Sequence, residues 1–453
     1  MTRTVPSLVL AAAVSVFGTA CGSDPSVTPD GGRVGVDAGP RDLGAMSDAP
    51  VGPVDAAGRD AGPPVDAGPS DVGDRYLATD GADTGDCSVN ACATLAYVAA
   101  QMAAGETVVV RDGTYPDGIG ATLLPRGSAA APTRVVSAHD GAATFTGPLS
   151  LYEDGATFYL EFVGLRFEGP DTKAIAGSNV TFRRVSFAGG PTSGNAASVA
   201  IGTNDFYPGA RDILLEDCLF YGLGGRYALL AYRTQNVVVR RAVLRKDGGW
   251  GLGGPSATEF EPEGVLNFYE SLNGLCDHCV VFDSLKLSDD SAEALGGFLS
   301  VSNGAPDSVG TLFTASVAVN NEYKGFAFEG GSSVTGARVE DSYAIANTYG
   351  IVANVVRTSD LTLERVAVIG NGGAGVASYG VETVSLLDSI VRGNTGPDLD
   401  GVSGSTTGAG PSPLDLSGFN SARIRAEFCR SATRGLCAGG TSFQEYLTGY
   451  LSR

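Results

Sequence analysis

The sequence has little of what metal and cofactor sites are usually built from. Among 453 residues there are two histidines, one tryptophan and three methionines. A structural zinc site needs four cysteine or histidine ligands, and the chain has a single Cys-x-x-Cys pair, Cys276-Asp277-His278-Cys279. No nucleotide, haem or flavin motif occurs either. The sequence therefore argues against zinc, nucleotide and haem chemistry.

Positive charge is also scarce. Lys and Arg total 30 against 50 Asp and Glu, which gives a net charge of −20, and only four of the positive residues are lysines. Such acidity argues against nucleic acid or an anionic membrane surface as the main partner, because both are negatively charged. It also makes any local cluster of basic residues informative.

Long hydrophobic runs are missing except near the N-terminus. There an apolar run from Val5 to Phe17 follows Arg3 and is too short to span a bilayer as a mature helix. Gly18-Thr19-Ala20-Cys21 comes next. This start resembles a bacterial lipoprotein signal, although Gly18 stands where such signals usually carry leucine.

The resemblance implies that residues 1–21 are a signal and that Cys21 is lipidated. It places the protein at the outer membrane or cell surface, with the lipid as its only membrane contact. The alternative is ordinary secretion of an unlipidated protein. Residues 22–75 contain no aromatic residue and are rich in Asp, Ala, Gly and Pro, so this stretch cannot form a core. We expect it to be a disordered tether.

The cysteines beyond Cys21 mostly occur in close pairs. Close spacing in an exported chain predicts local disulfides, and Cys276 with Cys279 is better explained this way than as half of a metal site. Cys218 has no near neighbour and is expected in the core. The predicted pairs are Cys87 with Cys92, Cys276 with Cys279, and Cys429 with Cys437.

The 65 glycines suit a chain that turns every few residues, and a short repeat runs between them. Each copy has two spaced apolar residues, a polar corner pair, and two more spaced apolar residues. Examples are Val180/Phe182 with Arg183-Arg184 and Val185/Phe187, and Leu361/Leu363 with Glu364-Arg365 and Val366/Val368. Alternation on both sides of the corner puts the apolar residues on one face of each strand. Steps of about 24 residues predict one coil of a three-strand solenoid.

This repeat resembles the right-handed parallel β-helix of the pectin-lyase-like superfamily. Gly113-Thr114-Tyr115, followed by Gly127 and a strand from Pro132, is similar to the opening coils of alginate lyase and chondroitinase B-type polysaccharide lyases. The catalytic Lys and Arg motifs of those lyases have no match here, so the resemblance implies the fold only. We expect an all-β domain of about 9 to 12 coils over residues 76–400.

Amphipathic segments suggest that both ends of the solenoid are capped by short helices. One helical face carries Leu95, Val98, Ala99 and Met102, and another carries Phe443, Tyr446, Leu447 and Tyr450. Residues 401–453 are accordingly expected to be a C-terminal loop and cap that hold the last disulfide. A column of polar side chains is expected five residues beyond the corner, at Asp290, Asn347, Asn371 and Asn394. Its first member, Asp290, depends on a coil that we expect near Leu285.

The candidate functional site is a basic stretch beside an oversized loop, which is expected to run from Gly248 to His278. Between 226 and 246 there are several positive residues and no Asp or Glu. Arginine binds carboxylates and sulfates through two hydrogen bonds, and aromatic rings stack on sugar faces, which predicts a groove for an acidic polysaccharide. The alternative is that the arginines pair with acidic corners of neighbouring turns, such as Glu216-Asp217. The predicted substrate-binding residues are Arg226, Tyr227, Tyr232, Arg233, Arg240, Trp250 and Tyr269.

If the groove is catalytic, β-elimination on a uronic acid is the expected reaction. Lys246 would be the base, and Arg241 or Arg245 would neutralise the carboxylate. Asp289, Asp290 and Glu293 would supply oxygen ligands if Ca²⁺ takes part. One alternative is a non-catalytic adhesin or a glycan- or protein-binding module. Another is a polygalacturonase-type hydrolase that uses Asp283, Asp289 and Asp290. A monomer is expected.

Overall fold

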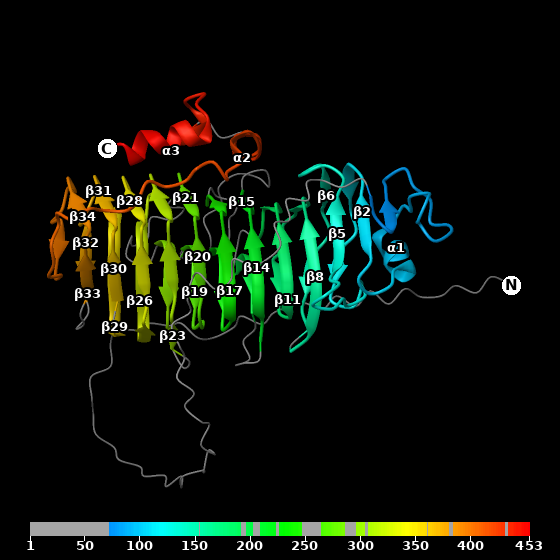
Figure 1. The fold of residues 1–453 in the computed structure, drawn as a ribbon, viewed down its shortest axis with the longest axis horizontal. Coiled ribbons are helices and arrows are strands. Elements are labelled where there is room, and N and C mark those ends of the chain that lie inside the picture. The colour runs from blue at the N-terminus through cyan, green and yellow to red at the C-terminus, as the bar shows by residue number, and fades with distance from the viewer. Residues whose placement is uncertain are drawn as a thin grey trace, which may run out of the picture. The chain divides into compact units, whose positions relative to one another are not determined.

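Three parallel sheets wind around a common interior in the computed structural model (Figure 1). The structure describes residues 72–153, 155–191, 196–202, 209–222, 226–246, 264–285, 296–303, 307–359, 361–379, 384–430 and 434–453. All of them belong to one compact unit, Pro69–Arg453. Cys21, Trp250, Asp289, Asp290 and Glu293, the signal predicted for residues 1–21, and residues 22–71 of the tether predicted for 22–75 lie outside the described residues. Arg75, the last residue of the predicted tether, begins the first described strand.

From β2 (Thr107–Val110) onward, each coil contributes one strand to each sheet, in the order sheet 1, sheet 3, sheet 2. Sheet 1 has these described strands: β1 (Arg75–Leu77), β2 (Thr107–Val110), β5 (Thr133–Ser137), β8 (Thr157–Val163), β11 (Ser178–Arg183), β14 (Arg211–Glu216), β17 (Gln235–Arg240), β20 (Leu275–Asp277), β24 (Leu312–Thr314), β27 (Arg338–Glu340), β30 (Leu361–Glu364) and β33 (Val384–Leu387). Sheet 3 has β3 (Gly113–Tyr115), β6 (Ala143–Phe145), β9 (Arg166–Glu168), β12 (Ser186–Ala188), β15 (Leu219–Tyr221), β18 (Val243–Leu244), β21 (Val280–Phe282), β25 (Val317–Val319), β28 (Tyr343–Ile345), β31 (Ala367–Ile369) and β34 (Ile390–Arg392).

Sheet 2 completes each coil. Its described strands are β4 (Ile119–Gly120), β7 (Leu149–Leu151), β10 (Lys173–Ile175), β13 (Ala197–Ile201), β16 (Tyr227–Tyr232), β19 (Gly264–Tyr269), β22 (Gly296–Val301), β26 (Lys324–Thr335), β29 (Tyr349–Ser359), β32 (Val376–Ser378) and β35 (Leu399–Asp400), and β23 (Ser308–Val309) pairs with β26. All of these strand pairs are parallel, as in the ladder between β14 and β17. The predicted fold, an all-β right-handed parallel β-helix, is confirmed.

The corner between sheets 1 and 3 explains the polar pair of the repeat. The second residue of the pair has a left-handed backbone, with φ of 52° at Arg184, 55° at Asp217 and 46° at Arg241. A single residue in this region turns the chain sharply, so strands on both sides can keep their apolar side chains inward. The same conformation recurs at His278, Asp341, Arg365 and Asp388.

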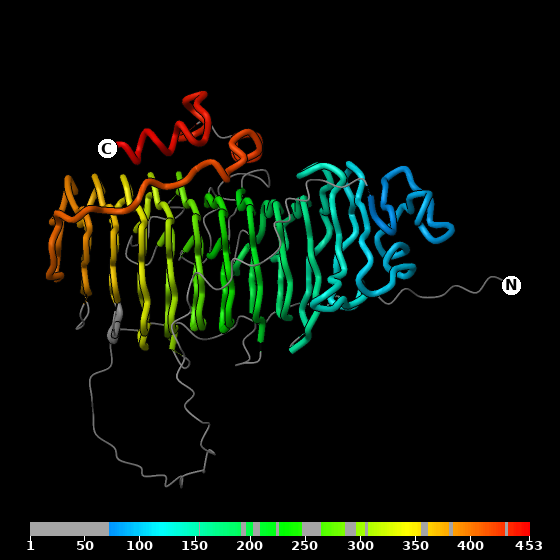
Figure 2. The backbone as a smooth tube through the Cα atoms, in the orientation of Figure 1, coloured from blue at the N-terminus to red at the C-terminus, as the bar shows by residue number. Residues whose placement is uncertain are grey.

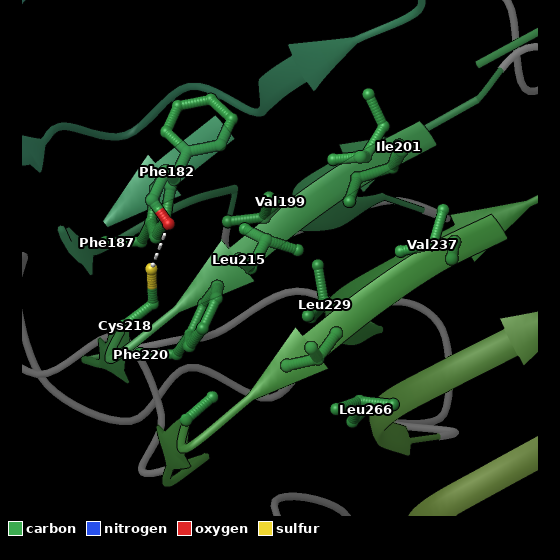
Figure 3. Packing of buried hydrophobic residues seen from close by; sticks show 14 of the residues in the cluster. Phe182, Phe187, Val199, Ile201, Leu215, Cys218, Phe220, Leu229, Val237 and Leu266 are labelled. Atoms are coloured by element: carbon green, nitrogen blue, oxygen red, sulfur yellow. Dashed lines mark hydrogen bonds between the residues drawn. The ribbon is translucent and has the colours of Figure 1, made fainter. Parts of the chain in front are cut away.

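Aromatic side chains stack along the interior from coil to coil. The ring centroids of Phe167 and Phe187 are 5.9 Å apart, and those of Phe187 and Phe220 are 5.0 Å apart. Figure 3 shows Phe187 and Phe220 with Cys218, whose thiol donates to the carbonyl oxygen of Phe182 at 3.5 Å. Cys218 is buried and forms no disulfide, as predicted. The predicted disulfides Cys87–Cys92, Cys276–Cys279 and Cys429–Cys437 are confirmed.

The asparagine column is present, but its first members differ from the prediction. Asn347 accepts from Asn321 Nδ2 at 2.9 Å and donates to Asn371 Oδ1 at 3.3 Å, and Asn371 donates to Asn394 Oδ1 at 2.9 Å. The coil expected near Leu285 in fact turns at His278, between β20 and β21. Ser284 therefore precedes Asn321 in the column, and its backbone N–H donates to Asn321 Oδ1 at 3.0 Å.

Helices lie at the N-terminal end and over sheet 3. α1 (Leu95–Gln101) contacts β1 and buries Leu95, Val98 and Ala99 in the main core, so the predicted N-terminal cap is confirmed. The helix expected near the C-terminus also forms, but it does not cover the last coil. Instead α2 (Ser421–Phe428), η2 (Gly435–Cys437) and α3 (Phe443–Leu451) pack on the outer face of sheet 3.

The C-terminal segment, residues 401–453, runs back along the coils to reach this position (Figure 2). The outer face of sheet 3 is apolar, with Leu219, Val243, Val280 and Val317 buried there. Phe428, Phe443 and Leu447 of the helices are buried against it. An apolar sheet face must be covered, and this requirement explains why the helices lie beside the coils and not over their end.

Candidate functional site

The predicted basic stretch is divided among different faces of the solenoid. Arg240 and Arg241 lie at the end of β17 and at the corner that follows it. Arg240 Nε donates to Asp277 Oδ2 at 3.1 Å, and Arg241 Nε donates to Asp217 Oδ1 at 2.7 Å. Both arginines thus pair with acidic residues of adjacent coils, as the alternative interpretation of the sequence predicted.

Arg240 belongs to a ladder of alternating charge on the outer face of sheet 1. Arg134 pairs with Glu161 at 2.7 Å, and Glu161 pairs with Arg183 at 2.9 Å. Arg183 pairs with Glu216, which also lies 3.8 Å from Arg240. The charges of this face therefore neutralise one another along the stack.

Arg245 is covered by the C-terminal segment. Its side chain is 0% exposed, its Nη2 donates to the carbonyl oxygen of Phe428 at 2.5 Å, and its guanidinium lies 5.7 Å from the ring centroid of Phe282. The geometry makes it an anchor for the segment. Arg245 is predicted from the sequence to neutralise a substrate carboxylate. That role stays a prediction, and the burial of Arg245 argues against it.

Lys246 is buried too. It is 1% exposed, and its Nζ donates to the carbonyl oxygen of Arg226 at 2.6 Å. The backbone N–H of Lys246 donates to Ser284 Oγ at 3.1 Å, so Lys246 begins the column that continues through Asn321. Desolvation, assisted by the charge of Arg226, holds the pKa of Lys246 well below 10.5. A low pKa suits a base, but the amine faces a backbone carbonyl in the described residues.

Four of the predicted binding residues do come together, on or beside the outer face of sheet 2. Tyr232 and Tyr269 are register neighbours on β16 and β19, with ring centroids 5.2 Å apart. Tyr227 begins β16 on the same face. Arg233 follows Tyr232, and its Nε donates to Glu270 Oε2 at 2.7 Å.

The outer faces of the three sheets differ in what they carry, and the centre of the sheet 2 face is buried, with Leu230 6%, Asn267 0% and Leu299 1% exposed. The outer face of sheet 3 is covered by the C-terminal segment, and sheet 1 carries the self-neutralised ladder. The chain passes from sheet 1 to sheet 3 through tight corners such as 184–185 and 217–218. The chain enters sheet 2 at Gly264 and Gly296 after stretches that the structure describes only in part, up to Lys246 and Leu285. Loops beside a rigid sheet are where binding residues are usually placed.

The outer face of sheet 2 has a regular layout. Leu266 and Phe268 point into the core, so alternation directs Asn267 outward. Its register neighbours are Leu230 and Leu299. Asn267 is 0% exposed, and in the part of the chain that the structure describes neither its Oδ1 nor its Nδ2 has a hydrogen-bond partner. A buried amide with both polar groups unmatched is costly unless a ligand or water satisfies it.

A buried ion pair lies on the same face two coils further. Lys324 and Glu329 are both on β26, and Lys324 Nζ contacts Glu329 Oε1. Their side chains are only 5% and 14% exposed. Ala327 lies between them and is fully buried. Desolvation raises the pKa of Glu329, although the charge of Lys324 opposes the shift.

A cavity of about 460 Å³ adjoins the start of these strands. Tyr349, the register neighbour of Lys324, lines it. The rim also carries a pair of opposite charges, Glu322 Oε1 and Arg434 Nη1, which are 3.8 Å apart. The volume falls in the range of small-molecule sites. We call Asn267, Tyr269, Lys324, Glu329 and Tyr349 the sheet 2 cluster.

Sequence reasoning missed Asn267, Lys324 and Glu329. Lys324 could have been found, because it is one of four lysines in an acidic chain. The alternation of Leu266 and Phe268 around Asn267 is also visible in the sequence, but Phe268 and Tyr269 fall within the oversized loop expected there. The predicted Ca²⁺ ligands lie outside the described residues. Within the described ranges no cluster of His, Cys, Asp or Glu could hold a metal ion.

The helices of the described part of the chain are too short or too polar to cross a membrane. The prediction that a lipid is the only membrane contact stays a prediction.

The comparisons with known proteins found similar solved structures but no matching family. No family model matches the chain, and no curated protein matches it. Similar structures include the A-module of a mannuronan C-5 epimerase from Azotobacter vinelandii, with 16% identity, 64% of this chain and 69% of that chain covered, and a TM-score of 0.39. An alginate lyase from Paenibacillus sp. has 13% identity and a TM-score of 0.38, and the match covers 73% of this chain and 99% of that chain. A surface adhesin of Streptococcus pneumoniae has 11% identity and a TM-score of 0.41, and the match covers 68% of this chain and 87% of that chain.

Proposed function

We propose that this chain is an exported, lipid-anchored surface protein that binds an acidic polysaccharide along the outer face of sheet 2. The observation that carries the proposal is the amide of Asn267, which is buried on that face with both polar groups unmatched among the described residues. An amide can donate to one sugar hydroxyl and accept from another. The outer face of sheet 3 is covered by the C-terminal segment, and the charges on that of sheet 1 neutralise one another in ion pairs.

The chemistry of the sheet 2 cluster suits a glycan with carboxylates. Tyr269 of the cluster and its register neighbour Tyr232 offer aromatic surface with a polar end, which is typical of glycan contacts. Lys324 supplies positive charge in a chain of net charge −20. The cavity beside Tyr349 has room for part of a bound chain. The predicted reaction, β-elimination by a lyase, stays a separate prediction that the binding assay can test at the same time.

The central test is calorimetric binding of the full chain, carrying Cys21→Ser to prevent lipidation, to polygalacturonate, alginate, a sulfated glycan and a neutral glucan. We expect binding to the polyuronates and none to the glucan. Asn267→Ala should weaken binding about tenfold, the equivalent of roughly 1.4 kcal/mol. Asn90→Ala, at an exposed position near α1, is the matched control and should bind as the parent does.

Two results would reject the proposal: no polyuronate binds, or Asn267→Ala binds as tightly as Asn90→Ala. Ultraviolet-absorbing unsaturated sugar ends in the binding mixture would add cleavage to binding. Binding without such products favours the adhesin alternative.

Export is supported by the disulfides, which persist mainly in oxidising compartments. Membrane fractionation of cells that produce the parent chain or the Cys21→Ser variant tests the anchor. We expect the parent in the membrane fraction and the variant in the soluble exported fraction. Equal distribution of the two would show that Cys21 carries no lipid.

A further inference from the structure

In the sheet 2 cluster, the carboxylate of Glu329 neutralises the positive charge of Lys324. Lys324 lies between Gly296 and Tyr349 in the register, and Glu329 lies between Val301 and Asn354. None of these four described neighbours on β22 and β29 is a charged residue. At the nearby corner, the charges of Glu322 and Arg434 face one another. Tyr349 is the titratable group among the register neighbours.

An anionic ligand cannot reach Lys324 without meeting Glu329. The two side chains share one buried contact, so a ligand carboxylate beside Lys324 would also lie close to the Glu329 carboxylate. Two carboxylates that share a buried site disfavour double ionisation, and one of them takes a proton. Burial already raises the pKa of Glu329 above its ordinary value, which makes Glu329 the group that is protonated more readily.

We propose that a uronate carboxylate replaces Glu329 as the partner of Lys324 and that Glu329 takes up one proton in the same step. Before binding, the Lys324 ammonium faces the Glu329 carboxylate. After binding, the ammonium faces the ligand carboxylate, Glu329 is a neutral acid, and the proton has come from the solvent. Charge balances, because the negative charge of the ligand group enters together with one positive charge. The inference rests on the proposed function.

Because a proton is taken up, the affinity for the uronate should depend on pH. Screening of charges by salt would not produce this dependence. Each uronate bound at Lys324 should require about one proton wherever Glu329 is ionised in the free protein. Above the pH at which Glu329 ionises in the free protein, the affinity for the uronate should then fall about tenfold for each pH unit. The neutral acid left behind can donate a hydrogen bond to the ligand, which favours a glycan over a simple anion.

The experiment is calorimetry with polygalacturonate at one pH in two buffers of different ionisation enthalpy, using the full chain with Cys21→Ser. The difference in observed heat divided by the difference in buffer enthalpy gives the number of protons. We expect about one proton per bound site in the parent and none in Glu329→Gln. Glu329→Gln should also bind about tenfold more tightly, because Lys324 no longer has a competing partner.

Two further variants complete the set. Lys324→Met should lose at least about tenfold in affinity, and circular dichroism shows whether it is folded. Glu340→Gln is the matched control, since Glu340 pairs with Arg338 on sheet 1 at 2.9 Å, and it should retain the uptake of one proton. Polygalacturonate that binds with no proton uptake would overturn this inference and leave the proposed function standing. No binding of any polyuronate would overturn both.

Discussion

Arg241 and Asp217 form a two-point ion pair across adjacent coils. Arg241 Nε donates to Asp217 Oδ1 at 2.7 Å, and Nη2 donates to Asp217 Oδ2 at 3.0 Å. Arg365 repeats the arrangement with Asp341, at 2.9 Å and 2.8 Å. Both side chains of each pair project from left-handed corner residues, so the corner stacks its charges in alternation. Arg241 is a structural residue in this geometry.

Replacement of Arg241 by methionine should lower stability and leave glycan binding intact. The pair is about one third exposed, so we expect a loss of about 1 kcal/mol in the free energy of unfolding, measured by thermal denaturation. Arg211→Met, at an exposed position of β14, serves as the control. If Arg241→Met is as stable as the control and loses polyuronate affinity, the groove first predicted around the basic stretch is correct and the sheet 2 face is not.

Lys173 should make the stability of the protein rise between pH 8 and 10.5. Its buried Nζ donates to the carbonyl oxygens of Gly169 and Ala188, at 2.9 Å and 3.0 Å. Desolvation lowers the pKa of Lys173 from 10.5 to about 8, against the opposing charges of Asp171 and Glu168. Below about pH 8 both folded and unfolded states hold the proton. Above it the unfolded state binds more protons than the folded state, so folding is favoured as the pH rises.

Denaturant unfolding of the parent and Lys173→Met across this range measures the effect. We expect the parent to gain up to about 3 kcal/mol relative to the variant between pH 8 and 10.5. A difference between the two proteins that does not change with pH would show that the ammonium titrates normally.

Glu427 should hold the C-terminal segment in place and make its attachment sensitive to acid. It is 3% exposed, lies 2.8 Å from Arg166 Nη2, and is also contacted by Tyr221 and Ser186. Burial opposes ionisation, but the hydrogen bond and charge of Arg166 outweigh it and hold the pKa of Glu427 below 4.5. Stability from this group is therefore full above pH 4.5 and is lost as the pH falls through the lower folded pKa.

Glu427→Gln should cost about 3 kcal/mol, because Arg166 is left without its buried partner. Limited proteolysis should then cleave the segment earlier, while Glu445→Gln, a change at the exposed start of α3, should cause only a small loss. Equal protease resistance of the parent and Glu427→Gln would mean that the apolar contacts alone hold the segment.

Asn347→Ala should be among the more damaging single changes in the later coils. The side chain accepts from Asn321 and donates to the carbonyl oxygen of Ala318 at 2.9 Å, all in a buried position. Its loss leaves these groups unmatched, and we expect a cost of about 2 to 4 kcal/mol in thermal unfolding. Asn394→Ala is a milder control because Asn394 is less buried. Similar losses in both would show that the column does not depend on burial.

The fold could be predicted because it depends on local alternation. Val180 and Phe182, then Val185 and Phe187, specify two inward faces and a corner without any knowledge of the rest of the chain. Register across insertions could not be predicted in the same way. The corner at His278 lies inside a Cys-x-x-Cys pair, so the spacing of the cysteines conceals its place in the repeat.

The candidate site was harder to predict because pairing across coils joins residues far apart in sequence. Arg240 looks like a free cation beside Arg241, but its partner Asp277 is 37 residues away. Burial of Arg245 depends on a segment that starts near residue 401 and whose position follows from the apolar face of sheet 3. Tyr232 and Tyr269 are register neighbours on successive coils, but the sequence placed Tyr269 in the oversized loop because register could not be followed across the insertion.

The return of the C-terminal segment along sheet 3 has a consequence for how the domain unfolds. A bare solenoid has contacts only between adjacent coils, so it can fray from either end. Here Glu427 contacts Arg166 of β9, and the carbonyl oxygen of Arg453 accepts from Arg392 of β34. One segment thus bridges coils from near the start to near the end of the stack. It should couple them into a single cooperative transition in place of stepwise loss from the ends.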